Sequence, residues 1–212
     1  MPKIKICGIT NLEDALNAVN LGADFLGFVF YKKSPRYITS AEAKKITLIL
    51  PKIVGKIGVF VDASQKQVKR IAKTCNLDYV QLHGNEDPVY CRKLAGRGKE
   101  KIKIIKAFRI KDADSLKNIS DYDVDFYLLD TFDKKARGGS GKSFNWNLVS
   151  KLKNLNLPIM LSGGLNHKNV KKAIKRLKLF AVDVSSGVEK SKGKKDFRLM
   201  RDFILAVKEA SL

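Results

Sequence analysis

Residues 3–30 read KIKICGITNLEDALNAVNLGADFLGFVF, and this stretch holds one complete unit of the pattern that decides the fold. A short apolar run at 3–7 is followed by apolar residues spaced three or four apart over 12–19, which favours an amphipathic helix. Thr10 and Asn11 stand just before that helix, where either side chain can cap the first turn. A second apolar run then fills 24–30. The stretch therefore predicts a strand, a helix and a second strand.

The same alternation continues to the end of the chain. Strands are predicted near 3–7, 24–30, 56–61, 78–82, 102–108, 126–130, 158–162 and 180–184. Strands that are apolar on both faces are typical of a parallel sheet covered by helices. Eight strand–helix units of about 26 residues each are close to the lower size limit of a closed barrel. We therefore expect an α/β protein, a single-domain (β/α)8 TIM barrel over residues 1–212, with an open doubly wound sheet as the alternative.

The composition of the chain indicates its cellular compartment and the redox state of its cysteines. No run of about 18 uncharged apolar residues occurs, and the first ten residues lack the apolar centre of a secretory signal. We expect a cytoplasmic protein with no membrane partner. The three cysteines match no paired metal or redox spacing, so free thiols are predicted. Cys75 and Cys91 fall on apolar helix faces and are interpreted as core residues.

The chain is strongly basic, with 42 Lys and Arg against 21 Asp and Glu and a net charge of +21. Such a charge attracts any polyanion, including nucleic acid, but it carries no specificity. Most of the excess falls on helix surfaces, as in 169–178, where the apolar residues form one stripe and the lysines point outward. The charge therefore predicts a solvated surface rather than a specific nucleic-acid partner.

The carboxyl ends of all strands open onto one mouth of a parallel barrel, so residues just after each apolar run become neighbours. The residues at these ends are Cys7, Arg36, Asp62, His83, Arg109, Asp130, the turn 162–165 and the turn 183–187. Together they offer a base, an acid, two guanidinium groups and two glycine-rich turns. This combination predicts a catalytic site for an anionic substrate.

Two consecutive turns favour phosphate binding, because loops after the seventh and eighth strands of such barrels commonly hold phosphate on backbone N–H groups. Small residues there let an anion approach the backbone; they are Gly163, Gly164, Ser185, Ser186 and Gly187. Ordinary strand-to-helix turns are the alternative. A further glycine-rich segment, 138–141, is interpreted as a mobile lid or a plain flexible loop.

Asp130 and Cys7 are the candidates for proton transfer. A carboxylate beside an apolar barrel interior can have its pKa raised enough to act as a general acid. Its alternative role is to cap the next segment or to pair with a lysine. Cys7 ends an apolar run, where a free cysteine is usually a small core residue. Its position alone leaves both roles open.

Seven motifs, taken together, resemble the phosphoribosylanthranilate isomerase family of tryptophan biosynthesis. They are KICGIT (5–10), GFVFYKKSPRYI (27–38), VQLHGNE (80–86), LLDT (128–131), GGSGKSFNW (138–146), LSGGLN (161–166) and FAVDVSSGVE (180–189). They run in the family's order over nearly the whole chain. The resemblance implies an isomerase that carries out an Amadori rearrangement, converting N-(5-phospho-β-D-ribosyl)anthranilate into 1-(2-carboxyphenylamino)-1-deoxy-D-ribulose 5-phosphate.

The resemblance also implies the roles of individual residues. Cys7 matches the family's base and Asp130 its acid, and a thiol ionises near neutrality when cations are close, whereas an alcohol does not. Arg36 is implied to meet the anthranilate carboxylate and Asp183 to lie near the anthranilate amine. His83 is a possible substrate binder. The phosphate is implied to lie on the two glycine-rich turns.

The reaction requires no metal and no cofactor, and none is expected. The expected partner is a small phosphosugar substrate, and the chain is expected to be a monomer or a homodimer. Two other barrels of the same pathway are rival interpretations, indole-3-glycerol phosphate synthase and the tryptophan synthase α subunit. They rely on a lysine or on carboxylates, so the cysteine at the first strand argues against both. A nucleic-acid-binding protein is the rival from another class, but the aromatic-interleaved basic motif of the common modules is missing.

Overall fold

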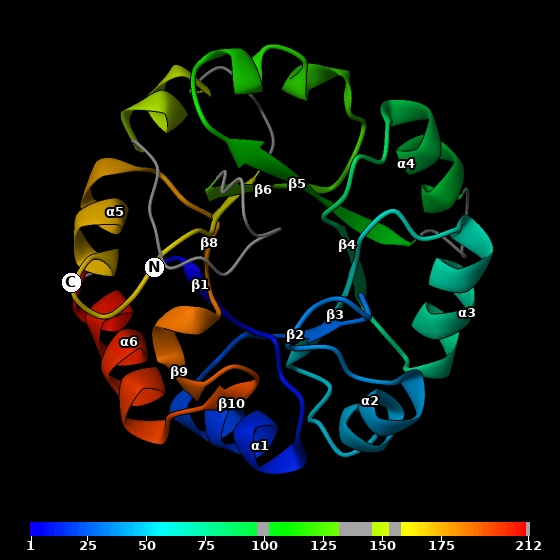
Figure 1. Cartoon of the computed structure of the whole chain (residues 1–212). Helices are drawn as coiled ribbons and strands as arrows, with labels where there is room; N and C mark the ends of the chain where they lie inside the picture. Colours follow the sequence, from blue (N-terminus) through cyan, green and yellow to red (C-terminus); the bar gives the residue numbers. More distant parts are fainter. Residues whose placement is uncertain (97–101, 132–145, 153–157, 211–212) are drawn as a thin grey trace.

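The computed structural model describes residues 1–96, 102–131, 146–152 and 158–210. Eight parallel strands form a closed barrel in the order of the sequence, and helices surround it (Figure 1). The strands are β1 (Lys3–Cys7), β2 (Phe25–Val29), β3 (Gly55–Phe60), β4 (Tyr79–Leu82), β5 (Lys103–Ile110), β6 (Phe126–Thr131), β7 (Ile159–Leu161) and β8 (Ala181–Val184). This confirms the predicted barrel and all eight predicted strands, and it rules out the open sheet.

Within the described residues, six α-helices lie outside the barrel. They are α1 (Leu12–Leu21), α2 (Ser40–Thr47), α3 (Gln65–Thr74), α4 (Pro88–Ala95), α5 (Val170–Arg176) and α6 (Phe197–Glu209). Asn11 caps α1 as predicted, because its side chain accepts a hydrogen bond from the backbone N–H of Asp14. Gly22 ends the same helix with a φ of 103°, a left-handed conformation that glycine adopts without strain. Local sequence signals thus set where this helix begins and ends.

The β5–β6 connection differs from the expected strand–helix pattern, because it contains the short 3-10 helices η2 (Asp114–Leu116) and η3 (Ile119–Asp121). In the described part of the β6–β7 connection, the 3-10 helix η4 (Trp146–Leu152) precedes β7. Residues 111–125 are rich in Asp, Ser and Asn. These side chains bond to nearby backbone groups and favour turns over helix interiors. The result is a barrel with 3-10 helices where a regular pattern would place α-helices.

An additional hairpin follows β8 and lies beside the start of α1 (Figure 1). The 3-10 helix η5 (Ser186–Val188) leads into the antiparallel strands β9 (Glu189–Ser191) and β10 (Lys194–Lys195). Thr10 Oγ1 donates to the Gly193 carbonyl at 2.5 Å, and the Lys195 backbone N–H donates to Asp14 Oδ2 at 2.8 Å. These bonds hold the hairpin over the first strand–helix loop, next to the barrel mouth.

The barrel interior changes from apolar to polar along its axis. Its lower part is filled by Phe25, Ile57, Ile105, Ala107, Leu128, Met160 and Ala181. Residues of the other parity, such as Ile4 and Ile6, face outward and pack under the helices. Above the apolar layer, the interior side chains of Lys5, Gln81 and Asp183 are at most 4% exposed. Buried polar groups on this scale need an explanation other than packing.

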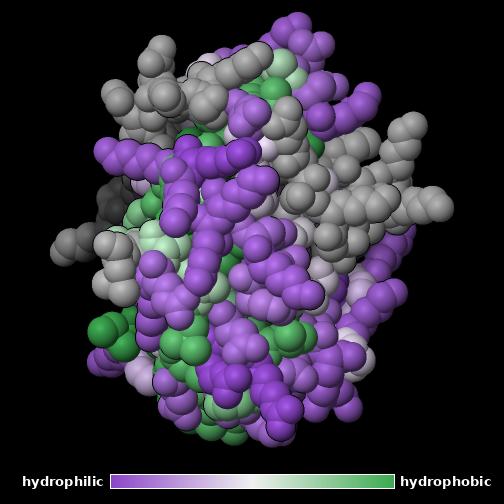
Figure 2. Space-filling view, turned by 90° about the vertical axis from the view of Figure 1, so that its left-hand side faces the viewer, coloured by the Kyte–Doolittle hydropathy of each residue, from purple (hydrophilic) through white to green (hydrophobic). Residues whose placement is uncertain are grey.

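The surface accounts for most of the positive charge. Figure 2 shows hydrophilic side chains over most of the described part of one face. The lysines of α5 are exposed, whereas Val170 and Ala173 on the same helix are fully buried. This confirms that the basic stretch 169–178 is a solvated helix face. Within the described residues, no helix is long and apolar enough to cross a membrane.

Candidate active site

Cys7 ends β1 on the interior side of the barrel and is 8% exposed. Its partner in β2 is Gly27, and a Cβ atom at that glycine would lie 2.7 Å from the Cys7 sulfur. No side chain could occupy that position without displacing the thiol. The chain therefore leaves specific space for Cys7. Cys75 and Cys91 are no more than 1% exposed and lie under helices, which confirms them as core residues.

A buried ion pair lies directly below the thiol. Lys5 Nζ donates to Asp183 Oδ1 at 2.9 Å, and the two residues are register partners in β1 and β8. Cys7 is two residues further along β1 than Lys5, so the two side chains lie on the same interior face of the strand. Burial raises the pKa of the Cys7 thiol, while the charges of Lys5 and Lys195 act to lower it. The expected cations are therefore present, but burial outweighs them in the free protein.

Arg36 is buried at the mouth and is held by a carboxylate that the sequence analysis did not single out. Its Nε and Nη2 atoms each donate to Glu189 at 2.7 Å, in a bidentate pair. Lys195 Nζ donates to the same carboxylate at 2.8 Å. Burial opposes ionisation of Glu189, but the two cations prevail and lower its pKa. Arg36 is thus positioned by the hairpin rather than extended toward solvent.

Asp130 ends β6 and has a polar partner at each oxygen. The Thr131 backbone N–H donates to Oδ1 at 2.7 Å, and His83 Nε2 lies 3.1 Å from Oδ2. On the other side of the imidazole, Gln81 Nε2 lies 2.8 Å from His83 Nδ1. The tautomer of the imidazole determines which atom of each pair donates. Among the described residues, Asp130 pairs with a histidine rather than with the lysine predicted as an alternative.

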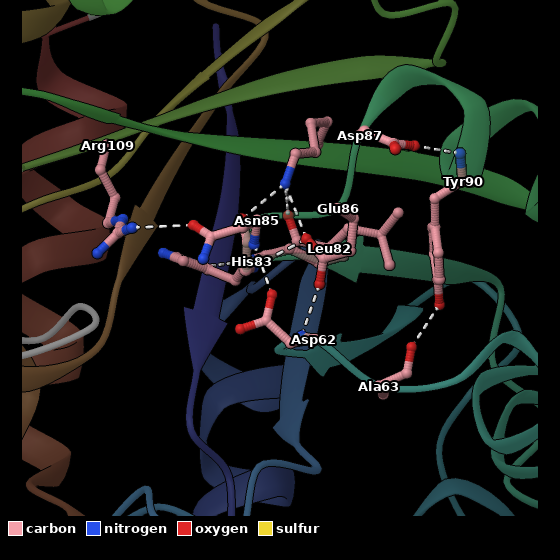
Figure 3. Close-up of polar contacts among 12 residues, drawn as sticks. Asp62, Ala63, Leu82, His83, Asn85, Glu86, Asp87, Tyr90 and Arg109 are labelled. Atoms are coloured by element: carbon pink, nitrogen blue, oxygen red, sulfur yellow. Dashed lines mark hydrogen bonds and ion pairs between the residues drawn. The ribbon is translucent and has the colours of Figure 1, made fainter.

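The loop that carries His83 is fixed by a second buried ion pair (Figure 3). Glu86 accepts from the backbone N–H groups of Asp62 and Gly84 and from Lys106 Nζ, all at 2.8–2.9 Å. Lys106 also donates to the Gly84 carbonyl at 2.9 Å. Asp62 accepts from the Asn85 backbone N–H in turn. Asp62, one of the strand-end residues, therefore has a structural contact that orients the loop after β4.

The two glycine-rich turns lie against their neighbours. A Cβ at Gly163 would lie 2.2 Å from Thr131 Oγ1 and 2.8 Å from Asp130 Oδ1, so only glycine fits beside the acid candidate. A Cβ at Gly187 would lie 2.0 Å from the Leu165 carbonyl oxygen, which brings the turns after β7 and β8 together. Ser185 Oγ is buried with no hydrogen-bond partner among the described residues. The glycine-rich segment 138–141, interpreted as a lid, lies outside the described residues.

Four residues near the site were not predicted from sequence: Lys5, Gln81, Glu189 and Lys195. Gln81 carries a detectable signal, because it is polar within a strand that is otherwise apolar, whereas Lys5 follows a second lysine, Lys3, on the same face of its strand. Gln81 and Lys5 each lie two residues before a candidate, His83 or Cys7, and so share its face. Glu189 closes a recognised motif. Lys195 carries no sequence signal, because it is one of many lysines.

A closed parallel barrel with a thiol, a carboxylate and a cluster of cations at the carboxyl ends of its strands has the features of a (β/α)8-barrel enzyme with its site at the mouth. A sequence model of the N-(5'-phosphoribosyl)anthranilate (PRA) isomerase family matches residues 4–206. The chain belongs to this family. Among the described residues, no group of three or more His, Cys, Asp and Glu could hold a metal ion.

Relatives and solved structures agree with this assignment over the full length of the chain. N-(5'-phosphoribosyl)anthranilate isomerase of Trichlorobacter lovleyi is 47% identical over 210 residues, which are 99% of this chain and 100% of the relative. The Thermotoga neapolitana protein of the same name is 48% identical over 98% of this chain and 99% of its own. The crystal structure of the Thermotoga maritima isomerase superposes with a TM-score of 0.90 at 42% identity, covering 99% and 100% of the two chains.

Proposed function

We propose that this protein catalyses the Amadori rearrangement of N-(5-phospho-β-D-ribosyl)anthranilate to 1-(2-carboxyphenylamino)-1-deoxy-D-ribulose 5-phosphate in tryptophan biosynthesis. One observation carries the proposal: the chain matches this isomerase family over nearly its whole length and has the Cys7 thiol at the end of β1 and the Asp130 carboxylate at the end of β6. A solved relative is described in complex with the reduced form of this product, at 42% identity. The test is a fluorescence assay that follows the loss of phosphoribosylanthranilate.

The chemistry requires two proton transfers. In the proposed mechanism, Asp130 protonates the furanose ring oxygen, the bond from that oxygen to C1 breaks, and the anthranilate nitrogen and C1 form an imine. Cys7 then removes the proton from C2, which gives an enolamine that tautomerises to the ketone. Acid and base come from opposite sides of the site, β6 and β1, and each is buried among groups that can influence its protonation.

Arg36 is proposed to bind the anthranilate carboxylate with the guanidinium N–H groups that do not bond to Glu189. The guanidinium has five N–H donors, and the bidentate pair uses Nε and one hydrogen of Nη2. Glu189 therefore fixes the plane of the group, and a second carboxylate can approach its other edge. Asp183 is proposed to lie near the anthranilate amine. The family resemblance supports both roles, and the buried positions at the mouth are consistent with them.

His83 is proposed to act on Asp130 and not primarily on the substrate, because both of its ring nitrogens have protein partners. Gln81→Leu removes the amide that pairs with His83 Nδ1, while a side chain of similar size remains. Since one hydrogen bond contributes about 1 kcal/mol, we expect kcat to fall roughly fivefold with KM little changed. Steady-state kinetics measure this. Gln65→Leu is the matched control, because Gln65 donates to the Tyr90 carbonyl, and not to a ring of the site. Equal kcat values for the two variants would remove Gln81 from the mechanism.

The phosphate is proposed to bind the turns after β7 and β8, at Gly163, Gly164, Ser185, Ser186 and Gly187. The first N–H groups of η5, those of Ser186 and Gly187, have no carbonyl partner within their helix, as at every helix start. The small residues and the buried Ser185 hydroxyl support an anion at this place. This is also the position at which barrels of this class commonly bind phosphate.

Ser186→Asp is expected to raise KM at least tenfold with little loss of stability, because it places a carboxylate where the substrate phosphate is proposed to bind. Gly164→Asp should act in the same direction, but its positive φ of 65° adds backbone strain, so Ser186 gives the cleaner test. Ser191→Asp, on the exposed strand β9, is the control. Inorganic phosphate should inhibit the wild type competitively. The site is wrong if phosphate leaves the rate unchanged at constant ionic strength.

The remaining expectations concern location and assembly. We propose a cytoplasmic enzyme whose partner is the small phosphosugar, with no specific nucleic-acid partner. The chain is proposed to act as one catalytic domain over residues 1–212, as a monomer or a homodimer. A T. maritima relative is described as dimeric, and this chain exposes three apolar side chains around the α2–β3 connection, Leu48, Ile49 and Ile53. Light scattering after size exclusion measures which state holds.

A further inference from the structure

Five charged side chains surround Cys7, and they come from four parts of the chain. Lys5 lies on β1, Asp183 on β8, Arg36 on the loop after β2, and Glu189 and Lys195 on the β9–β10 hairpin. They form two ion-paired groups, Lys5 with Asp183 and Arg36 with Glu189 and Lys195. With three cations and two carboxylates, one positive charge is in excess. A thiolate at Cys7 would balance it.

Lys5 is the cation of this set that shares a strand face with the thiol, two residues before Cys7 on β1. Its side chain is fully buried, and its ammonium group donates to Asp183 at 2.9 Å. Lys195, by contrast, lies on the hairpin and is bonded to the Glu189 carboxylate and to the Ser185 carbonyl oxygen. Lys5 is therefore the cation that the barrel itself places beside Cys7.

A buried ammonium group is costly, and a single carboxylate partner does not explain why this one is placed beside a cysteine. Ion pairs removed from water often contribute little net stability, and apolar residues of similar volume can replace them at no loss. The rest of the lower barrel interior is apolar, so an apolar residue at this position would suit the packing. A positive charge on the strand face that carries Cys7 is what an apolar residue could not provide.

We propose that Lys5 is a positioning residue of the isomerase reaction: its ammonium group supplies the positive charge against which the Cys7 thiolate forms, and Asp183 both holds that charge in place and limits its effect. The inference rests on the proposed role of Cys7 as the base. It adds the residue pair that determines when the base is available.

The protonation equilibria agree with this assignment. Burial lowers the pKa of Lys5, but Asp183 and Cys7 more than compensate, so the ammonium form persists at neutral pH. Burial raises the pKa of Cys7, Lys5 is the strongest opposing influence, and Asp183 acts in the same direction as burial. Removing Lys5 and removing Asp183 should therefore shift the ionisation of Cys7 in opposite directions. If the Lys5–Asp183 pair only stabilised the fold, the two variants would not shift the pKa of Cys7 in opposite directions.

The test uses the rate at which iodoacetamide alkylates Cys7 in the folded protein, measured from about pH 6 to 10 by peptide mass analysis. Only the thiolate reacts, so the pH midpoint reports its ionisation without any substrate. Lys5→Met is expected to move the midpoint up by one unit or more, which lowers the rate at pH 7 about tenfold. Asp183→Asn is expected to move the midpoint down.

Lys56→Met is the matched control, because Lys56 is also a barrel-strand lysine, is 4% exposed, and pairs with Asp78 at 3.1 Å. It should leave the Cys7 midpoint unchanged. Lys5→Arg, which retains the charge, should stay closer to the wild type than Lys5→Met. If Lys5→Met does not fold, the Asp183→Asn midpoint decides alone, and a midpoint at or above the wild-type value overturns the proposal.

The proposal also fails if folded Lys5→Met titrates like the wild type, or if both variants shift the same way. The kinetic readout separates this failure from a failure of the proposed function. In the expected case, the acidic limb of kcat/KM for Lys5→Met moves up in pH together with the alkylation midpoint. If the Cys7→Ser variant keeps full activity while the alkylation midpoints shift as expected, then the Lys5 effect on Cys7 stands and the role of Cys7 as base falls.

Discussion

Replacing Cys7 with serine is expected to leave a folded protein whose turnover falls at least 10²-fold. The two side chains differ by one atom, and Gly27 leaves the space that either of them needs. A serine hydroxyl does not ionise near neutrality, so the proposed removal of the C2 proton loses its base. General base catalysis typically contributes about 10² to 10⁴-fold, which sets the size of the loss.

The alternative role of Cys7 predicts the opposite result. A small core residue replaced by serine would lower the free energy of unfolding by about 1 kcal/mol and leave catalysis intact. Cys75→Ser and Cys91→Ser are the controls, because both cysteines are buried under helices and away from the barrel mouth. They should lose stability but retain turnover. Assaying all three variants by the fluorescence of phosphoribosylanthranilate, with urea unfolding in parallel, separates the two roles.

The pH dependence of the wild type gives a second check on the same residue. Burial raises the pKa of the Cys7 thiol, so the base is protonated at low pH and becomes available only as pH increases through that raised value. We therefore expect kcat/KM of the wild type to rise with pH above the ordinary range of a thiol. Alkylation of Cys7 should follow the same curve, and inorganic phosphate should slow it. A wild-type rate in Cys7→Ser, together with full activity of the alkylated enzyme, would leave Cys7 as packing.

Asp130→Asn is expected to fold and to bind phosphate, but to lose about 10² to 10⁴-fold in kcat, because an amide cannot protonate the ring oxygen of the substrate. The change is nearly isosteric. Its Oδ1 contact with the Thr131 backbone N–H can be retained by the amide oxygen, while the amide NH₂ replaces the oxygen that faces His83 Nε2. A moderate loss of stability is therefore expected in addition to the loss of turnover.

Separate measurements of binding and turnover keep these two effects apart. The inhibition constant of inorganic phosphate should be unchanged in Asp130→Asn, since the proposed anion site lies on the turns after β7 and β8. Asp125→Asn is the matched control, because Asp125 precedes the same strand at its other end and accepts from the Ile104 backbone N–H. A kcat of Asp130→Asn within threefold of the wild type would exclude Asp130 as the acid.

Much of the fold is determined by residues that are close together in the sequence, which explains why it could be predicted. Each strand is a short apolar run bounded by turn residues, and each cap, such as Asn11 for α1, acts within a few residues. The rule that parallel strands share a mouth then places Cys7, His83 and Asp130 at one end of the barrel. The predicted pattern was wrong between β5 and β6, where two 3-10 helices stand in place of an α-helix, because turn-forming side chains outweighed the regular alternation.

The pairing of the charged groups could not be predicted in the same way. Lys5 and Asp183 are 178 residues apart, Arg36 and Glu189 are 153 apart, and His83 and Asp130 are 47 apart. A basic chain with 42 Lys and Arg offers many partners for each carboxylate. Sequence patterns indicate which face a side chain is on, but they do not indicate which of these partners it meets.

The sequence by itself determined the strand order, the residues at the barrel mouth and the family motifs, because each of these features depends on a short stretch of the chain. Only the tertiary structure decided that Arg36 is held by Glu189, that His83 pairs with Asp130, and that Lys5 pairs with Asp183. The physical reason is closure of the barrel. When β8 pairs with β1, it brings Asp183 beside Lys5 in the buried interior, where a charge must find its partner among the few groups within reach.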